Sequence, residues 1–208
     1  MADKPIAPQD QLKLAAEAIS TQVGTALLTQ GRDMAYTAAV RLENTGPGRT
    51  EFRVAHADGS TDAGTFTEAS KGFSNGGKRR TQDAVYLLDK HNNMIDSTIT
   101  TTQKHAADPD TQVSRELRGM DGELVAREQG KCSSNSDGSS TCFMNITNAN
   151  GDAVGTSTRT TKVSPDKLAM EFTNVYKDAL GRPLGTVHET LKVDPETQTG
   201  IVIVGVTH

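Results

Sequence analysis

The pattern of apolar and polar positions changes once along the chain, near Met34. Before that point, apolar residues recur at spacings of three and four positions, which places them on one side of an α-helix. Pro8 near the start and Gly31 at the end are typical of helix termini. The pattern predicts one amphipathic helix of roughly twenty residues, about 30 Å long. Its apolar stripe consists of Leu12, Ala15, Ala16, Ile19, Val23, Ala26 and Leu27.

After Met34, apolar positions alternate with polar ones. Met170 and Phe172, for example, alternate with Glu171 and Thr173. Alternation of this kind is typical of antiparallel strands that have one face in the core and one face in water. The remainder of the chain is therefore predicted to be a series of such strands.

The turns between these segments are marked by asparagine and glycine. Asn92, Gly122, Gly151 and Gly181 follow one another at intervals of 30, 29 and 30 residues, and loops richer in Pro and Ser lie between them. These residue types supply the positive φ values that tight hairpins require. The spacing predicts a β-meander of about twelve strands, built from hairpin repeats of roughly thirty residues.

We therefore predict an all-β fold, an antiparallel up-and-down meander preceded by one amphipathic helix. Residues 1-32 are expected to form the helical segment and residues 33-208 the β-meander domain. Strands with one apolar face either close into a barrel or pack as two layers, and the sequence leaves both arrangements open. The helix is expected either to pack within this β-structure or to join subunits.

Composition excludes several partners. The 208 residues include 22 Lys and Arg against 26 Asp and Glu, for a formal net charge of -4, so no nucleic-acid partner is expected. No apolar run approaches the roughly 20 residues of a membrane-spanning helix. Aromatic residues make up 4% of the chain and tryptophan is missing, which weakens the case for an apolar ligand pocket.

The chain contains two cysteines, Cys132 and Cys142, on the two arms of one predicted hairpin. The further ligands that zinc requires are missing, and so is the C-x-x-C spacing of redox pairs. A disulfide across the hairpin fits the spacing. We therefore expect a disulfide and an extracytoplasmic location, whether secreted, periplasmic or on a surface. Two reduced thiols would instead indicate a cytoplasmic protein.

The sequence offers little other chemistry. None of the common catalytic, phosphate-binding or metal-binding motifs is present, so no metal and no cofactor are expected. Thr98, Thr100 and Thr102 lie on one face of a predicted strand, which we interpret as a face in contact with water.

Three classes of function remain, and we favour the first. It is a non-enzymatic extracytoplasmic structural or interaction protein, such as a surface, matrix, filament or virion component. Such a protein would self-assemble as a homo-oligomer through its helix and its last strand, Gly200 to Val206. That strand is apolar on both faces, so we expect both faces to be covered.

The second class is a β-barrel that binds a small apolar ligand. The residues expected to line it are Phe52, Met170, Phe172 and Val187. The third class is a small-barrel cyclase or isomerase, which needs mostly shape and one acid. Its candidate groups are Glu171, His188 and Tyr176, provided that they point inward.

Overall fold

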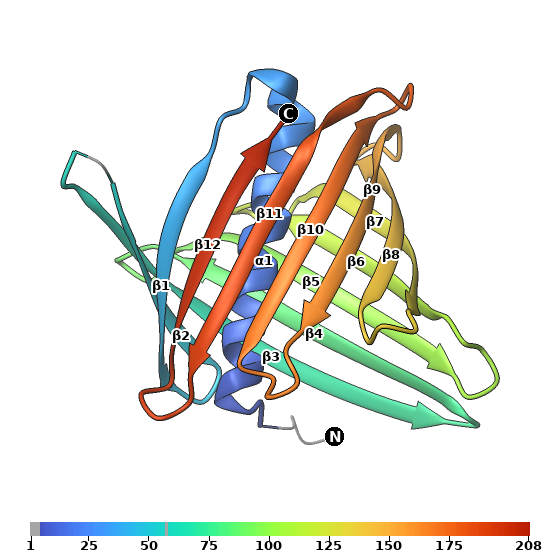
Figure 1. Cartoon of the computed structure of the whole chain (residues 1–208), viewed down its shortest axis with the longest axis horizontal. Helices are drawn as coiled ribbons and strands as arrows, with labels where there is room; N and C mark the ends of the chain where they lie inside the picture. The colour runs from blue at the N-terminus through green and yellow to red at the C-terminus, as the bar shows by residue number, and fades with distance from the viewer. Residues whose placement is uncertain (1–4, 57) are drawn as a thin grey trace.

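The computed structural model describes residues 5–56 and 58–208, and this part of the chain contains one α-helix followed by twelve strands (Figure 1). Helix α1 spans Pro8–Gln30, and a short 3-10 helix, η1 (Gly31–Asp33), follows it. The strands are β1 (Thr37–Gly46), β2 (Arg49–Ala55), β3 (Thr61–Asn75), β4 (Lys78–Leu88), β5 (Met94–His105), β6 (Thr111–Arg118), β7 (Leu124–Ser134), β8 (Ser140–Asn148), β9 (Ala153–Val163), β10 (Ala169–Asp178), β11 (Pro183–Asp194) and β12 (Thr199–Thr207). These elements confirm the predicted helix and meander.

The strands form a closed barrel. Each strand pairs antiparallel with its neighbours in the chain, and β1 closes the barrel by pairing with β12 from Thr37↔Gly205 to Glu43↔Thr199. This pairing distinguishes the barrel from the two-layer alternative that the sequence left open. Closure also gives every strand a partner on both sides, so neither end of the meander leaves an exposed edge.

The tight turns have the backbone conformation that the sequence predicts. Asn92, Gly122, Gly151 and Gly181 all have positive φ values, between 62° and 86°. Asn92 is one of the few residue types besides glycine that tolerates this region. The positions at which the meander reverses direction are therefore encoded locally, in the turn residues themselves.

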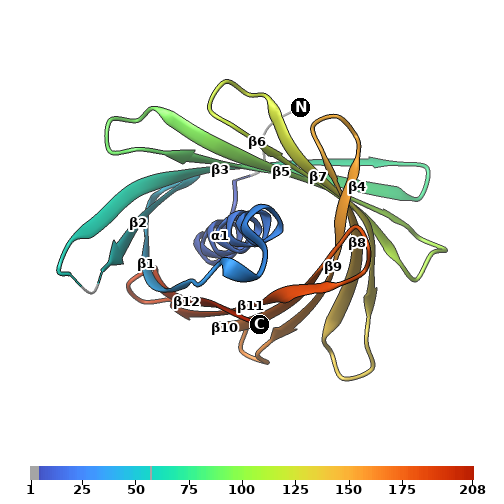
Figure 2. The ribbon, with the colours of Figure 1, turned by 90° about the horizontal axis from the view of Figure 1, so that it is seen from above.

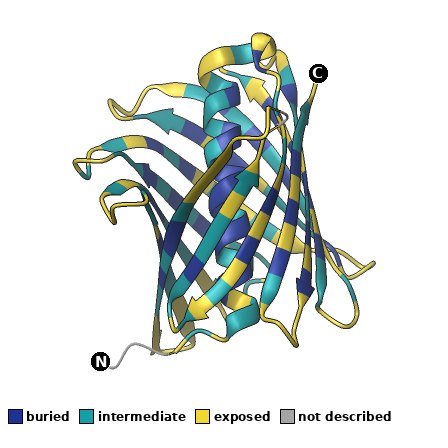
Figure 3. Cartoon of the chain, turned by 90° about the vertical axis from the view of Figure 1, so that its left-hand side faces the viewer, coloured by how far each residue is buried: buried dark blue, intermediate teal, exposed yellow. Residues whose placement is uncertain are grey.

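Helix α1 lies inside the barrel, with strands around it on every side (Figure 2). Figure 3 shows buried and exposed positions alternating along the strands, and the buried apolar residues of the strands form one core cluster with those of the helix. Leu12, Ala15, Ala16 and Leu27 of the predicted stripe are fully buried and belong to one core cluster. The helix therefore packs within the barrel. No helix in the described residues has an apolar stretch long enough to cross a membrane.

The helix does not lie equally close to all the strands. It packs against β10, β11 and β12 and against β1 to β4, with β11 as its main partner. The helix approaches the sheet closely at Gly24, where a Cβ atom would lie 1.9 Å from the hydroxyl oxygen of Tyr176 on β10. Only glycine allows this contact, and the helix is thereby held against one side of the lumen.

The last strand is buried on one of its two faces. Val202 and Val204 of β12 point into the barrel and are fully buried, but Ile201 and Ile203 on the outer face are each 54% exposed. A single chain therefore covers only the inner face, and cover of the outer face by another subunit stays a prediction. Both edges of β12 are paired, which leaves only this outer face for contact with a second copy. Self-assembly stays a prediction, which light scattering of the purified protein tests.

Candidate ligand site in the barrel lumen

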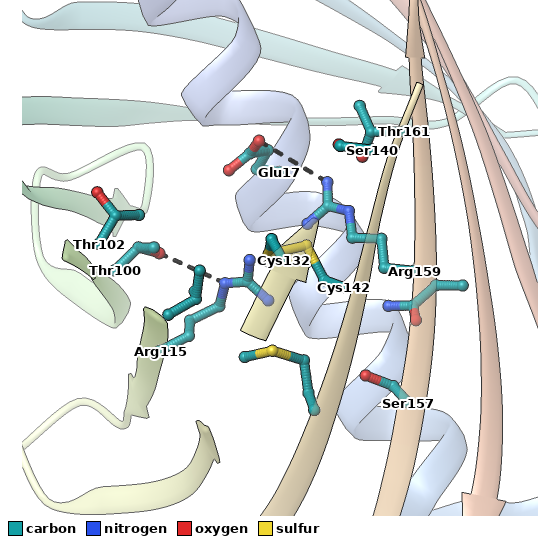
Figure 4. A pocket seen from close by; sticks show the side chains of 13 residues that line it. Glu17, Thr100, Thr102, Arg115, Cys132, Ser140, Cys142, Ser157, Arg159 and Thr161 are labelled. Atoms are coloured by element: carbon teal, nitrogen blue, oxygen red, sulfur yellow. Dashed lines mark hydrogen bonds and ion pairs between the residues drawn. A yellow bond between two sulfur atoms is a disulfide. The ribbon is translucent and has the colours of Figure 1, made fainter. Parts of the chain in front are cut away.

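A cavity of about 200 Å³ lies between α1 and the opposite side of the barrel, which β5 to β9 form (Figure 4). Most of its lining side chains are polar or charged. They are Glu17, Thr100, Thr102, Val113, Arg115, Cys132, Ser140, Cys142, Met144, Ser157, Arg159, Thr161 and Asn174. Because a single water molecule needs only about 10–15 Å³ of such a volume, the cavity has room for a small organic molecule.

Strand alternation points both arginines into the lumen. Arg115 lies between Val113 and Leu117 on the inward face of β6, and all three are buried. Arg159 on β9 pairs directly with Cys142 on β8, so its side chain leaves the sheet on the same face as the disulfide. In Figure 4 the two guanidinium groups lie on either side of the disulfide.

Arg115 has partners within the protein. It forms a buried ion pair with Glu128, its cross-strand neighbour on β7, and its Nε donates to Thr100 Oγ1 at 3.4 Å. Burial alone would lower the pKa of Arg115, but the attraction of Glu128, Glu17 and Tyr176 together outweighs it and the pKa is raised. Arg115 therefore stays charged, and Glu128 neutralises it.

Arg159 is equally buried but has weaker partners. It is 5% exposed, and its Cζ lies 4.2 Å from the ring centroid of Phe172. Its Nη2 is 3.8 Å from Glu17 Oε1, which is beyond hydrogen-bonding distance. Within the described residues, neither Nε nor Nη2 has a hydrogen-bond partner. A buried charged group that makes no hydrogen bond carries a large desolvation cost.

The inner end of the cavity contains further polar groups that lack partners. Asn174 Nδ2 donates to Tyr176 Oη at 2.7 Å, and burial raises the pKa of this tyrosine, which therefore stays neutral. The other amide atom, Asn174 Oδ1, and the hydroxyl of Ser157 have no hydrogen-bond partner among the described residues. The buried end of the cavity thus offers both donors and acceptors to an occupant.

Elsewhere in the lumen two carboxyl groups, Glu68 and Glu189, are buried and a third, Asp96, is half-buried. Burial raises the pKa of Asp96 to about 6, that of Glu68 to about 7 and that of Glu189 to about 8. Gln22 Nε2 donates to Asp96 at 2.9 Å, and Gln11 Nε2 donates to Glu68 at 3.4 Å. These contacts tie the helix to strands that carry acids, and the acids are largely protonated at mildly acidic pH.

The predicted disulfide lies in the wall of the cavity. Cys132 and Cys142 face each other in the register of β7 and β8, and their sulfur atoms are within bonding distance. The pair lies close to the turn at Gly138, toward the end of the barrel where Thr102, Ser140 and Thr161 are only half-buried. Arg115, Ser157 and Arg159 are buried further in, so the cavity opens toward that end.

The four residues predicted to line an apolar site all face the lumen, but they contact the core. Met170, Phe172 and Val187 are buried in the cluster that includes the helix, and Phe52 packs against it with its ring 5.0 Å from that of Phe66. None of the four lines the cavity described above. Their role in binding an apolar ligand stays a prediction, and in this structure their neighbours are protein atoms.

The three candidate catalytic groups are not brought together. Glu171 and His188 lie on the outer face of β10 and β11 and are exposed, whereas Tyr176 is fully buried in the lumen. The condition that they point inward is met by Tyr176 alone. No catalytic arrangement follows from these residues.

One interpretation from the sequence is wrong. Thr98, Thr100 and Thr102 of β5 do not form a face in contact with bulk water. Thr98 is 5% exposed, and Thr100 and Thr102 line the cavity. The period of two is correct, but the polar face of this strand is the one that faces the lumen.

Sequence reasoning also missed the charged residues of the lumen. Arg115 lies in phase with Val113 and Leu117, and Glu189 lies in phase with Val187 and Leu191. A charged residue in the apolar phase of a strand points toward the core and is a signal for a buried polar site. That signal was present in the sequence at both positions.

The fold and the site together define a class of protein, a closed twelve-strand barrel that holds a helix and an arginine-lined cavity. In the described residues, no cluster of three or more His, Cys, Asp or Glu side chains is arranged to hold a metal ion. Comparisons with family models, curated proteins and solved structures find no match to the chain. The function therefore has to be argued from the cavity itself.

The buried acids predict how stability depends on pH. A carboxyl group whose pKa is raised by folding stabilises the protein fully below its unfolded pKa, and this contribution is lost as the pH rises through the folded value. For Asp96, Glu68 and Glu189 the loss begins near the unfolded pKa of about 4 and is complete at about pH 6, 7 and 8, respectively. We expect urea unfolding to give a lower free energy of unfolding at about pH 8.5 than at about pH 5.

The control is a triple variant, Asp96→Asn, Glu68→Gln and Glu189→Gln, in which the pH dependence should flatten. The surface substitution Glu171→Gln should leave it unchanged. Stability that is constant or increases over this pH range would contradict the burial of these three acids.

The disulfide makes a second prediction. The Cys132→Ser/Cys142→Ser double variant should lose about 2–3 kcal/mol of unfolding free energy, the loop-closure value for a short loop. Intact mass spectrometry of the native protein should show a mass lower by two hydrogen atoms than after reduction. Equal masses would mean that the thiols are free and would remove the argument for an oxidising compartment.

Proposed function

We propose that the protein is a non-enzymatic, extracytoplasmic interaction protein whose barrel holds a small polar ligand in the cavity beside α1. The observation that carries this proposal is the state of Arg159, which is buried at the cavity wall with Nε and Nη2 unsatisfied by any described residue. A ligand that accepts hydrogen bonds from these atoms would offset the cost of burying them.

The shape and lining of the cavity support binding rather than catalysis. The apolar part of the lumen is filled by the helix, and the space that remains is small and lined by both polar or charged and apolar groups. Glu171 and His188 are on the outside of the barrel, which leaves no acid–base pair in the lumen from the candidate groups. A polar ligand also fits better than the apolar ligand that the meander alone would suggest.

The disulfide supports the proposed extracytoplasmic location. Cys132–Cys142 lies near an open end of the barrel, and such bonds persist in oxidising surroundings. In a secreted, periplasmic or surface protein this disulfide would stay oxidised and would hold β7 and β8 together in the cavity wall. The proposal therefore places both the binding site and its staple outside the reducing cytoplasm.

The test is a thermal-shift panel of small polar compounds that comprises amides, polyols, amines and carboxylates. At least one of these chemical classes should raise the melting temperature of the native protein, because ligands that bind only the folded state stabilise it. Ser157→Leu fills the inner end of the cavity and should abolish the shift. Thr158→Leu, at the next position of β9 and on the outer face, is the matched control and should retain it.

Circular dichroism of both variants establishes that the barrel is folded before the shifts are compared. If no compound class stabilises the native protein, or if Ser157→Leu responds as the native protein does, the cavity is a water-filled space and the proposed function is wrong.

A further inference from the structure

The guanidinium group of Arg159 is held in a defined orientation. The residue is 5% exposed, and the group lies over the ring of Phe172, with Cζ 4.2 Å from the ring centroid. A cation that lies over an aromatic face is attracted by the electrons of the ring. Phe172 therefore supports one face of the planar group, and the in-plane N–H bonds are free to serve the cavity.

The two unsatisfied nitrogens belong to the same edge of this plane. Nε and Nη2 are both buried, and neither has a hydrogen-bond partner within the described part of the chain. Their N–H bonds are nearly parallel, at the spacing of the two oxygens of a carboxylate. Arginine binds carboxylates through such paired hydrogen bonds, which are stronger than bonds between neutral groups.

None of the nearby carboxyl groups of the chain occupies this edge. Glu128 is held by Arg115, and Glu17 Oε1 stays 3.8 Å from Nη2. Both oxygens of Glu189 lack hydrogen-bond partners, and burial raises its pKa to about 8, so this group is mostly uncharged at neutral pH. The edge is therefore buried and oriented, and apart from the long ion pair of Nη2 with Glu17 it makes no hydrogen bond within the described residues.

We propose that Arg159 is the recognition residue of the lumenal cavity and that its ligand is a short-chain carboxylate, bound through the Nε–Nη2 edge of the guanidinium group. The inference rests on the proposed function of the same cavity and names the chemical class of its ligand.

The remaining cavity wall matches the rest of such a molecule. Val113, Met144 and the disulfide provide apolar and polarisable surface for a short carbon chain. Thr100, Thr102 and Ser140 provide hydroxyl groups that donate or accept hydrogen bonds from a polar substituent. The volume of about 200 Å³ limits the ligand to a small molecule.

The experiment compares three probes at constant ionic strength on the full-length, oxidised protein: propionate, propionamide and sulfate. Propionate should bind saturably with a Kd in the micromolar to millimolar range, since a ligand with about five non-hydrogen atoms has limited binding energy. Propionamide, which has the same shape without the charge, should bind about tenfold more weakly or less. Sulfate, which is charged but not planar, should also bind more weakly. Isothermal titration and the thermal shift provide two independent readouts.

Arg159→Met is the central variant. It keeps much of the packing on Phe172 but removes the charged edge, so propionate binding should weaken about tenfold or more. The melting temperature without ligand should stay the same or rise, because a buried charge that makes no hydrogen bond has been removed. Arg127→Met, on the outer face of β7, is the matched control and should bind propionate normally.

The Glu17→Gln variant tests whether the ligand lies on the Nε–Nη2 edge, next to Glu17. This acid is the nearest to Nη2, and its charge repels a bound carboxylate. Neutralising it should tighten propionate binding about threefold or more. If binding weakens instead, the ligand does not lie on the Nε–Nη2 edge.

Three results would overturn the assignment. Equal binding of propionate and propionamide would agree with the proposed polar ligand site but would contradict the proposal that its ligand is a carboxylate. Equal binding of sulfate and propionate would mean that charge alone is recognised. A large loss of stability in Arg159→Met without ligand would make Arg159 a structural ion-pair partner of Glu17. If no probe binds and the wider panel also fails, the proposed function falls together with the inference.

Discussion

Closing twelve strands into one barrel creates a lumen that the strands alone cannot fill. A barrel of about eight strands is just wide enough to be packed by its own inward side chains, and the diameter grows roughly in proportion to strand number. Here the additional width is occupied by α1, which lies within the barrel and buries Leu12, Ala15, Ala16 and Leu27 against it. Gly24 allows the helix backbone to touch the ring of Tyr176. The rest of the interior depends on this one packing arrangement.

A helix held against one side leaves the other side incompletely packed. The strands from β10 through β12 to β4 contact α1 and supply aliphatic and aromatic side chains. The facing wall, from β5 to β9, is instead built from threonine, serine, arginine and the disulfide. A void lined by such groups favours polar contents, whereas an empty cavity is typical of apolar walls. The cavity is thus a consequence of helix placement, and its chemistry is a consequence of which residues line the distant wall.

Local sequence patterns predicted the elements of this fold, but not their closure or the contents of the lumen. The three- and four-residue spacing of α1, the period of two in the strands and turn residues such as Gly122 and Gly181 depend only on nearby positions. Closure depends on the pairing of β1 with β12, which are more than 150 residues apart in the chain, and no local pattern records it. The threonines of β5 are predicted to face water, because polarity alone does not distinguish a solvated face from a wide interior. Arg115 and Glu189 lie in phase with apolar neighbours, and this pattern is the sequence signal for a lumen that contains polar side chains.

The fold also gives the two cysteines a structural role. Cys132 and Cys142 connect β7 and β8 at the less packed wall, beside Arg159. The disulfide joins two strands in the part of the barrel that has the fewest contacts with the helix. It also forms part of the cavity surface.

The central claim is that α1 is a permanent part of the barrel interior, and native-state hydrogen exchange measures this directly. Backbone amides of the helix centre, residues 15–24, should exchange as slowly as those of β11, because they become exposed only when the barrel opens. Helix amides that exchange much faster than the amides of β10 and β11 would show that the helix leaves the lumen while the barrel stays folded. That result would contradict the packing from which the cavity, its polar wall and its proposed ligand all follow.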